Sequence, residues 1–557
     1  MADGQGVILI TLRTCIKLSR VLLTAVLLAA FLVLMAVMSA PDYAEPLPTY
    51  TENELAEIEA MRDNALDPES SLALQVDVDY SKGESAAWYP KGEPEILKEL
   101  VAGGELPPVA ERVGSEPCVV RGLDGIGQYG GSLLRLNHFG MGDRLTYANL
   151  VRFSPHGYPI VPHIAKGWEV SDDARTWTFY LRRGMKWSDG HPFTSEDIRF
   201  WFEDEASNKK VGGAIPGVMQ VNGQSGKVIV YPDDPYKVTF EFAEPNGIFL
   251  AELAKQTGAP LCNSPAHYKK QFHPDYASEE DLETYMAQTR TPSVRALYTY
   301  ISDVKNPLHP RLWPWVIRAD TPSPPHTAVR NPYYFCVDEQ GNQLPYADQV
   351  LNDECSADMV PIKAASGAVT AQGRNLGFSD YTYLMSQREE GNYDVYYWYA
   401  ASRSYFVLRP NLNRITSPKH PEWRFKRELM NEKRFRQALS LAINRKAIIK
   451  AEYSGQAKPV NAAPGPESPF YHEELYTAFT DYDPERANEM LDALGLTQRD
   501  AEGYRTFRNG SRMTFYIDYV KGVVPSAPVH FVVRDWAAVG IRAIPRLRGE
   551  TLFITES

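Results

Sequence analysis

The chain has 557 residues, of which 23% are charged and 44% hydrophobic, the composition of an ordinary globular protein. One hydrophobic core rarely organises so long a chain, so about three or four domains are expected. The formal net charge of −12 argues against a nucleic-acid partner, because binding to phosphates requires a basic face.

The N-terminal region carries an export or anchoring signal. Residues 21–40 form an uncharged apolar run of bilayer-spanning length, with basic residues before it and acidic residues after it. This predicts a transmembrane signal anchor with residues 1–20 in the cytoplasm and the body outside. A cleaved signal peptide is the competing interpretation, but Met38 is too large for a good cleavage site and Pro41 would follow the cut.

The next region, residues 41–105, is polar and rich in turn residues, which predicts a stalk or N-terminal extension.

Two short patterns in or near this region resemble ligand-binding motifs but lack an essential feature of each motif. Asp77 and Asp79 imitate the first half of a calcium loop, but Lys82 stands where the loop needs glycine. A G-x-G-x-x-G pattern begins at Gly125, but a strand-like run follows it and a dinucleotide site requires a helix there.

The most ordered signals lie between residues 147 and 204. Alternating β-branched and aromatic residues predict a strand over Thr176–Leu181, and residues 185–187 predict a second extended run. The pair Asp189-Gly190 predicts a turn. Thr194 and Asp197 have the spacing of a capping box, so a helix should begin near Ser195.

Two further helices are predicted towards the C-terminus. Asn431 is a plausible N-cap for a helix over residues 431–449. An apolar stripe at helical spacing predicts its core face, which consists of Phe435, Ala438, Leu439, Ala442 and Ile443. Asp483-Pro484 should begin another helix that ends at Gly495.

No pattern in the chain supports catalysis, a cofactor or a metal site. The nucleophile elbow, the P-loop and the H-E-x-x-H motif are all missing from the sequence. His267 and His273 have no third ligand at metal-site spacing and are expected to be surface residues. Exported proteins can form disulfides, so a bridge between Cys336 and Cys355 is conceivable. The five cysteines are scattered and odd in number, so no bond is assigned.

Several longer segments resemble one known family. They are an L-V-x-x-x-P-x-G opening at residues 150–157, W-E-V-S-x-D at 168–173, W-T-F-x-L-R-x-G at 177–184 and W-x-D-G-x-P-F-T-x-E-D at 187–197. R-N-P-Y-Y at residues 330–334 and G-N-Q-L-P-Y-x-D at 341–348 follow in the same order. Together they resemble the family 5 extracellular solute-binding proteins of ABC importers, which include oligopeptide-, dipeptide- and nickel-binding proteins.

This resemblance implies an α/β architecture, the two-lobed periplasmic-binding-protein fold of the class II type. The first lobe would cover residues 106–395, with an extra domain inserted at about 150–312, and the second lobe would cover residues 396–557. The lobes would close over a ligand by a hinge. Relatives usually continue well beyond the segment that corresponds to residues 539–541, so the second lobe is expected to be truncated at the C-terminus.

The family resemblance also implies a ligand site near the junction of the lobes. An aromatic run with one cation and two nearby amides lies there, and its candidate ligand-binding residues are Tyr397, Trp398, Arg403, Tyr405, Asn411 and Asn413. Aromatic faces could hold a peptide or a sugar and Arg403 could bind a carboxylate, although strand packing explains the run equally well.

The function implied is that of the extracytoplasmic solute-binding component of an ABC import system, with oligopeptide as the first choice of ligand and membrane permease subunits as partners. The protein would work on the periplasmic side of the inner membrane, either anchored or released. Two alternatives stay open at this point. One is a membrane-anchored receptor or scaffold that keeps the fold without transport, and the other is a non-functional truncated remnant.

Overall fold

The structure is a computed structural model, and it describes most of the chain from residue 74 onwards. The gaps within that part are residues 124, 138–147, 156, 158, 319–323, 397–403, 405, 454, 456, 467, 469, 521–523, 550–552 and 554–557. Nearer the N-terminus only residues 23–24, 27–31 and 33–35 are described. The chain divides into two units, Met1–Ala60 and Met61–Ser557, and the account below concerns the second.

The predicted membrane segment at residues 21–40 lies largely outside the described residues. The short pieces that are described there are helical, and their apolar side chains, such as Leu27 and Phe31, are exposed. Within the described part of the chain, no helix combines the length and the apolar character needed to cross a membrane.

Residues 74–120 fold onto the body of the protein, which differs from the predicted stalk. This segment contains η1 (Tyr80–Ser85), α3 (Glu95–Ala102), α4 (Val109–Val113) and β1 (Cys118–Val120). Trp88 is buried in a small core with Val113, Val119 and Val337. The segment is polar on average, which favours a stalk, but its few large apolar side chains are enough to pack it onto the body. Asp79, part of the apparent calcium loop, caps η1 by accepting a hydrogen bond from the Ser81 N–H.

A mixed four-stranded sheet draws its strands from two distant parts of the sequence. Its order is β11 (Trp315–Val316), β12 (His326–Arg330), β14 (Gln349–Asp353) and β2 (Ser132–Leu136). The β14–β2 pair is parallel and the other two pairs are antiparallel. Side chains of Thr370 and Gln372 bond to the β2 backbone, so this edge of the sheet is covered by its own chain.

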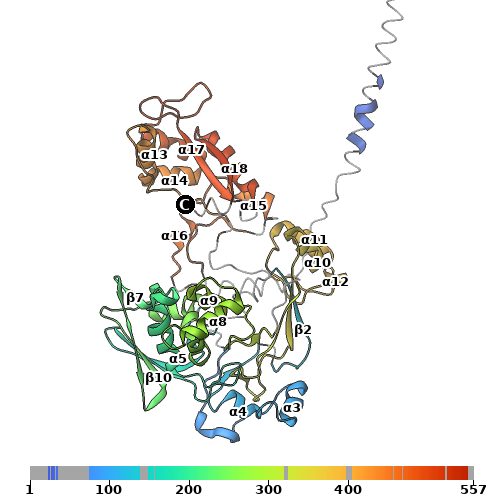
Figure 1. The fold of residues 1–557 in the computed structure, drawn as a ribbon. Helices are drawn as coiled ribbons and strands as arrows, with labels where there is room; N and C mark the ends of the chain where they lie inside the picture. Colours follow the sequence, from blue (N-terminus) through green and yellow to red (C-terminus); the bar gives the residue numbers. More distant parts are fainter. Residues whose placement is uncertain are drawn as a thin grey trace, which may run out of the picture. The chain divides into compact units, whose positions relative to one another are not determined.

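The inserted region between these strands has its own antiparallel sheet and large core. The strand order is β5 (Ala165–Val170), β6 (Thr176–Leu181), β10 (Asp234–Glu241) and β9 (Lys227–Tyr231). Phe179, Phe240 and Phe249 pack edge to face or tilted in the centre of this core. Figure 1 shows β10 and the helices α5, α8 and α9 of this region in shades of green.

Small strand pairs and helices complete the inserted region. The additional strands are β3 (Val151–Phe153) with β4 (Ile160–Pro162) and β7 (Gln220–Val221) with β8 (Gln224–Ser225). The helices are α5 (Ser195–Phe200), which continues into the π-helical turn η3 (Trp201–Ala206), α6 (Phe249–Ala254), α7 (Ala266–Lys269), α8 (Glu279–Thr289) and α9 (Val294–Ile301).

Local predictions in this region are largely confirmed. The strand at Thr176–Leu181 is β6, and Gly190 forms the predicted turn with a φ of +90°. The capping box is present, since the Thr194 N–H donates to Asp197 and the Glu196 N–H donates to Thr194. The second extended run is wrong as a strand, because Lys186 makes only a single bridge to Pro192.

The capping carboxylate leads to a pH prediction. Burial raises the pKa of Asp197 to about 6, although backbone N–H groups of Thr194 and Ala266 bond to it and oppose the shift. A pKa above the unfolded value means that the folded state binds the proton more tightly. The stabilisation from this proton is therefore present below about pH 4 and is lost as the pH rises through about 6.

We expect wild type to lose about 2 kcal/mol relative to Asp197→Asn between about pH 4 and pH 7. Urea unfolding of both proteins across this range measures the difference. A difference between the two proteins that stays constant with pH would contradict the assignment.

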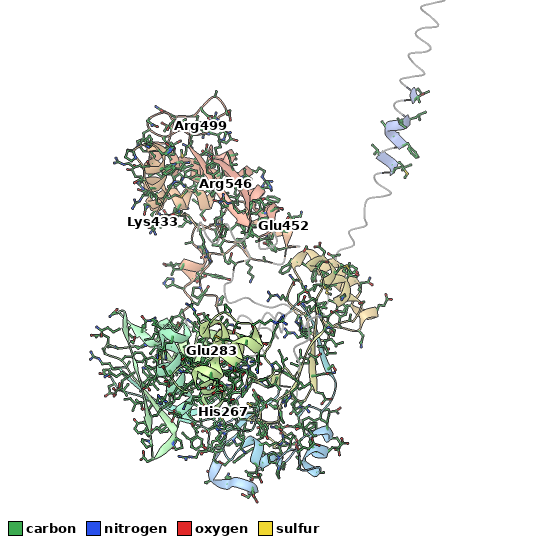
Figure 2. All side chains as sticks on the ribbon, in the orientation of Figure 1. His267, Glu283, Lys433, Glu452, Arg499 and Arg546 are labelled. Atoms are coloured by element: carbon green, nitrogen blue, oxygen red, sulfur yellow. The ribbon has the colours of Figure 1, made fainter. Side chains whose placement is uncertain are left out.

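The part of the chain predicted to form the second lobe is built from helices around one parallel strand pair. Its elements are α13 (Pro421–Asn431), α14 (Lys433–Leu441), α15 (Arg445–Glu452), α16 (Glu473–Thr477), α17 (Pro484–Ala493), β15 (Thr514–Val520), α18 (Ser526–Ala538) and β16 (Arg542–Arg548). The strands β15 and β16 run parallel, with α18 as the crossover that a parallel pair requires. Lys433 and Arg546 are labelled on this lobe in Figure 2.

The predicted core stripe of α14 is confirmed, but its predicted cap is wrong. All five stripe residues are buried, from Phe435 to Ile443. Asn431 is the last residue of α13, and its side-chain amide donates to the Leu412 carbonyl. The neighbouring Glu432 caps α14, and the helix stops at Leu441 instead of continuing to residue 449. Asp483 caps α17 as predicted, and Gly495 follows with a φ of +80°.

Candidate functional site

The predicted ligand-binding residues fall mainly outside the part of the chain that the structure describes. Four of them, Tyr397, Trp398, Arg403 and Tyr405, are in this position. Asn411 and Asn413 are described and exposed, and the Asn413 N–H donates to the Asn411 side chain at 3.0 Å. The bond closes a local turn over residues 411–413.

The described residues beside the predicted site define how the chain enters the second lobe. Tyr396 is 77% exposed. Further on, the Ser404 hydroxyl donates to the Phe406 carbonyl at 3.0 Å, and Phe406 and Leu408 pack against the core of the second lobe. This packing holds Phe406 and Leu408 in place, and the candidate residues at 397–405 directly precede them in the sequence.

The family motifs at residues 330–348 have a structural role. The guanidinium of Arg330 donates to the carbonyls of Pro345 at 2.8 Å and Ala347 at 3.0 Å. Gln343 is fully buried, and it donates to the Pro332 and Tyr334 carbonyls while it accepts from Arg112. Both side chains are buried and bond to the protein's own backbone, so the motifs hold β12, β13 (Cys336–Asp338) and β14 in place.

A second family motif fixes a close approach between two backbones. Gly184, the glycine of W-T-F-x-L-R-x-G, has a φ of +84°, and a Cβ on it would lie 2.8 Å from the Cα of Gly114. Gly114 has a φ of +92° and would clash in the same way with Gly184. Only glycine fits both positions, so this motif joins the N-terminal segment to the inserted region.

His267 and His273, the two histidines considered for a metal site, both contact other groups of the protein. His267 hydrogen-bonds to Asp189 at 2.7 Å and stacks on His191 with ring centroids 3.9 Å apart. His273 is fully buried and bonds to the Asp204 carbonyl, so the prediction that it is a surface residue is wrong. Among the described residues, no group of three or more His, Cys, Asp or Glu side chains could hold a metal ion.

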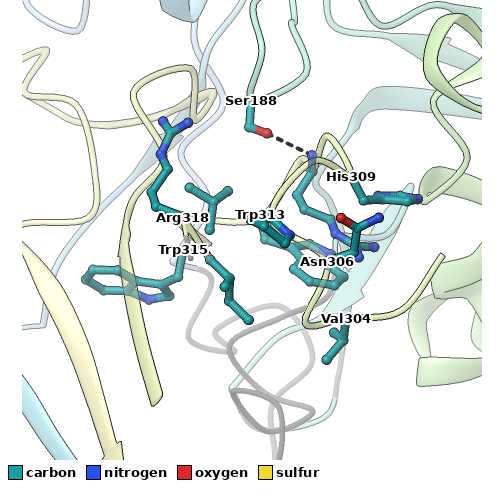
Figure 3. Close-up of a pocket in the computed structure, with 11 residues that line it drawn as sticks. Ser188, Val304, Asn306, His309, Trp313, Trp315 and Arg318 are labelled. Atoms are coloured by element: carbon teal, nitrogen blue, oxygen red, sulfur yellow. Dashed lines mark hydrogen bonds between the residues drawn. The ribbon is translucent and has the colours of Figure 1, made fainter. Parts of the chain in front are cut away.

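A small polar pocket lies beside the segment that leads into β11 (Figure 3). The residues that line it are Ser188, Val304, Asn306, Pro307, His309, Arg311, Trp313, Trp315, Val316, Ile317 and Arg318. Its volume of about 20 Å³ is room for about one water molecule. The buried Nε2 of His309 has no hydrogen-bond partner. These dimensions suit an internal water and exclude a peptide or an oligosaccharide from the pocket in this structure.

Burial lowers the pKa of two histidines, one of them at this pocket. The pKa of His309 is lowered well below its usual range by burial and by the nearby Arg311. The pKa of His163, which is also buried, is lowered for the same kind of reason. The guanidinium of Arg311 lies 4.5 Å from the Trp313 ring and donates to Asn263 at 3.0 Å. This cation is therefore committed to internal contacts.

The fold of the described residues is the mixed α/β fold of two-lobed periplasmic binding proteins. A solved structure of the oligopeptide-binding protein OppA matches with a TM-score of 0.66 and 32% identity, over 84% of this chain and 73% of that one. The periplasmic binding protein MelB from Agrobacterium fabrum C58, solved in complex with stachyose, matches with a TM-score of 0.59 and 21% identity. That match covers 87% of this chain and 75% of the other.

Sequence comparison leads to the family. Residues 159–549 match the bacterial extracellular solute-binding proteins, family 5 Middle, and the chain belongs to this family. The periplasmic alpha-galactoside-binding protein of Rhizobium meliloti (strain 1021) is 29% identical over 457 residues, which are 75% of this chain and 61% of that protein. The chain thus spans about three fifths of the length of this curated relative.

Proposed function

We propose that the protein is the solute-binding component of an ABC import system and that it acts outside the cytoplasm. Family membership over residues 159–549 is the observation that carries the proposal. In this proposal residues 106–395 act as the first lobe, residues 150–312 as its extra domain and residues 396–557 as the second lobe. The lobes close over a solute, and a membrane permease receives it from the closed form.

Two classes of solute are supported by different relatives. The structure of an oligopeptide-binding protein, at 32% identity, favours peptides. The alpha-galactoside-binding relative, at 29% identity over 457 residues, favours galactoside oligosaccharides. Oligopeptide is the first candidate and galactoside the second. Residues 21–40, acting as an anchor or as a cleaved signal, would keep the protein on the periplasmic side of the inner membrane.

The ligand is proposed to contact the residues next to the lobe junction. Tyr397, Trp398 and Tyr405 would supply stacking surfaces, and Arg403 would bind a carboxylate if the solute is a peptide. Asn411 and Asn413 are exposed in the structure, and their amides would offer hydrogen bonds to hydroxyl or peptide groups. A galactoside has no carboxylate, so the contribution of Arg403 distinguishes the two classes.

A thermal-shift screen of the full chain against oligopeptide and galactoside pools tests the function. A solute present at about a hundred times its Kd should stabilise the native state by about 2.7 kcal/mol. A cooperative melt that neither pool moves would contradict both candidate classes.

The contribution of Arg403 is a separate prediction. If the solute is a peptide, Arg403→Ala should weaken its binding by about tenfold or more, because a charged hydrogen bond contributes about 1.5–3 kcal/mol. Arg424→Ala is the matched control, since Arg424 is largely exposed on α13, where it pairs with Glu428. Equal affinities for the two variants, measured by calorimetry with the peptide, would remove Arg403 from the proposed site.

A further inference from the structure

Two cysteines face each other on neighbouring strands. The strands β1 and β13 form a parallel pair in which Cys118 lies directly opposite Cys336. Both side chains are buried, at 0% and 2% exposure. The Cys118 N–H donates to the Phe335 carbonyl at 3.0 Å, which holds the register at this point.

The two cysteines are free thiols in this structure, and their pairing sets a backbone separation that a disulfide can span. Paired residues on parallel strands direct their side chains to the same face of the sheet, and the strands lie about 4.8 Å apart. The Cα atoms of disulfide-bonded cysteines are usually about 4.4–6.8 Å apart. The thiols also interact directly, because hydrogen bonding from Cys336 is the main cause that lowers the pKa of Cys118, while the nearby guanidinium of Arg182 adds to the effect.

We propose that Cys118 and Cys336 form a disulfide that ties β1 to β13 and so fixes residues 74–120 against the segment around β13. The bond would form wherever the chain folds in an oxidising environment, as the proposed extracytoplasmic location provides. The conceivable bridge between Cys336 and Cys355 is then not formed, because Cys336 is already paired.

The chemistry is thiol–disulfide exchange with an external disulfide, such as glutathione disulfide. The Cys118 thiolate attacks one sulfur of that disulfide, which gives a mixed disulfide and releases one thiol. The Cys336 thiolate then attacks the Cys118 sulfur, the new S–S bond forms, and a second thiol leaves. The two cysteines are oxidised, one external disulfide is reduced, and the two thiol protons end on the released thiols.

Burial determines when this exchange occurs. An external disulfide cannot reach the thiols in the folded protein, because both side chains are buried. The exchange must therefore take place during folding, when the strands first pair. Afterwards the same burial protects the bond from reductants.

Refolding the full chain in a glutathione redox buffer tests the proposal without any assumption about its location in the cell. The refolded protein is denatured in N-ethylmaleimide without reductant, and its peptides are mapped by mass spectrometry. We expect one linked peptide pair that contains Cys118 and Cys336, while Cys15, Cys262 and Cys355 carry the label. Label on both Cys118 and Cys336, or a link from either to another cysteine, would overturn the proposal.

Variants separate this bond from general effects on folding. Cys118→Ala should leave Cys336 fully labelled, whereas the matched variant Cys262→Ala, also at a buried cysteine, should keep the linked peptide. Folding in reductant should lower the Tm of wild type by about 5–10 °C, because a disulfide that closes a long loop stabilises the chain. The Tm of the double variant Cys118→Ala/Cys336→Ala should not depend on reductant. An equal change in Tm for wild type and the double variant would contradict the proposed disulfide.

Discussion

Replacing Lys269 with methionine should lower the free energy of unfolding by about 3–5 kcal/mol, which is the usual cost of removing one partner of a buried ion pair. The Lys269 ammonium lies 2.6 Å from Glu205, and the two side chains are 7% and 10% exposed. Ser264 and Tyr298 also donate to this carboxylate, the latter at 2.6 Å. Urea unfolding of the two proteins measures the difference.

The cost should arise from the carboxylate that stays behind. In Lys269→Met the side chain of Glu205 remains buried without its counter-charge, so the double variant Glu205→Gln/Lys269→Met should recover part of the lost stability. Lys98→Met is the control, because Lys98 and Glu95 form an exposed pair whose loss should cost less than about 1 kcal/mol. Equal losses for Lys269→Met and Lys98→Met would contradict the buried network.

Replacing Phe435 with alanine should destabilise the second lobe by about 3–5 kcal/mol, as large-to-small changes in a core do. The ring of Phe435 is fully buried on α14, and its centroid lies 5.8 Å from that of Phe515 on β15. It therefore joins the helical layer to the strand pair. Thermal unfolding followed by circular dichroism measures the loss.

A matched control uses the same chemical change on the surface. Phe470 is 80% exposed, so Phe470→Ala should change the free energy of unfolding by less than about 0.5 kcal/mol. If Phe435→Ala were as mild as this control, the second lobe would not have the core described above. The comparison is independent of any ligand.

The features that could be predicted from the sequence are those whose causes are local. The turn at Gly190, the capping box of Thr194 and the apolar stripe that includes Phe435 each depend on residues a few positions apart. N-cap propensity favours Asn431 over Glu432, so the sequence alone indicates the wrong cap for α14. In the structure Asn431 is the last residue of α13, and the cap therefore falls on Glu432.

Features with distant causes could not be predicted in this way. Nothing near Cys118 in the sequence indicates that it pairs with Cys336, and the polar surroundings of Trp88 conceal its burial. The buried pair of Lys269 and Glu205 also depends on chain segments that meet only in the folded state. For the candidate site, aromatic composition indicated residues 397–405 but could not distinguish stacking on a ligand from packing in a core.

Isothermal titration calorimetry of the full chain with a defined oligopeptide and with stachyose measures solute binding itself. We expect saturable one-to-one binding of one of these solutes with a negative heat-capacity change, because closing the lobes would bury apolar surface. Binding of the peptide would identify a peptide importer component, and binding of stachyose a galactoside importer component. A folded protein that gives no saturable heat with either solute would contradict the account.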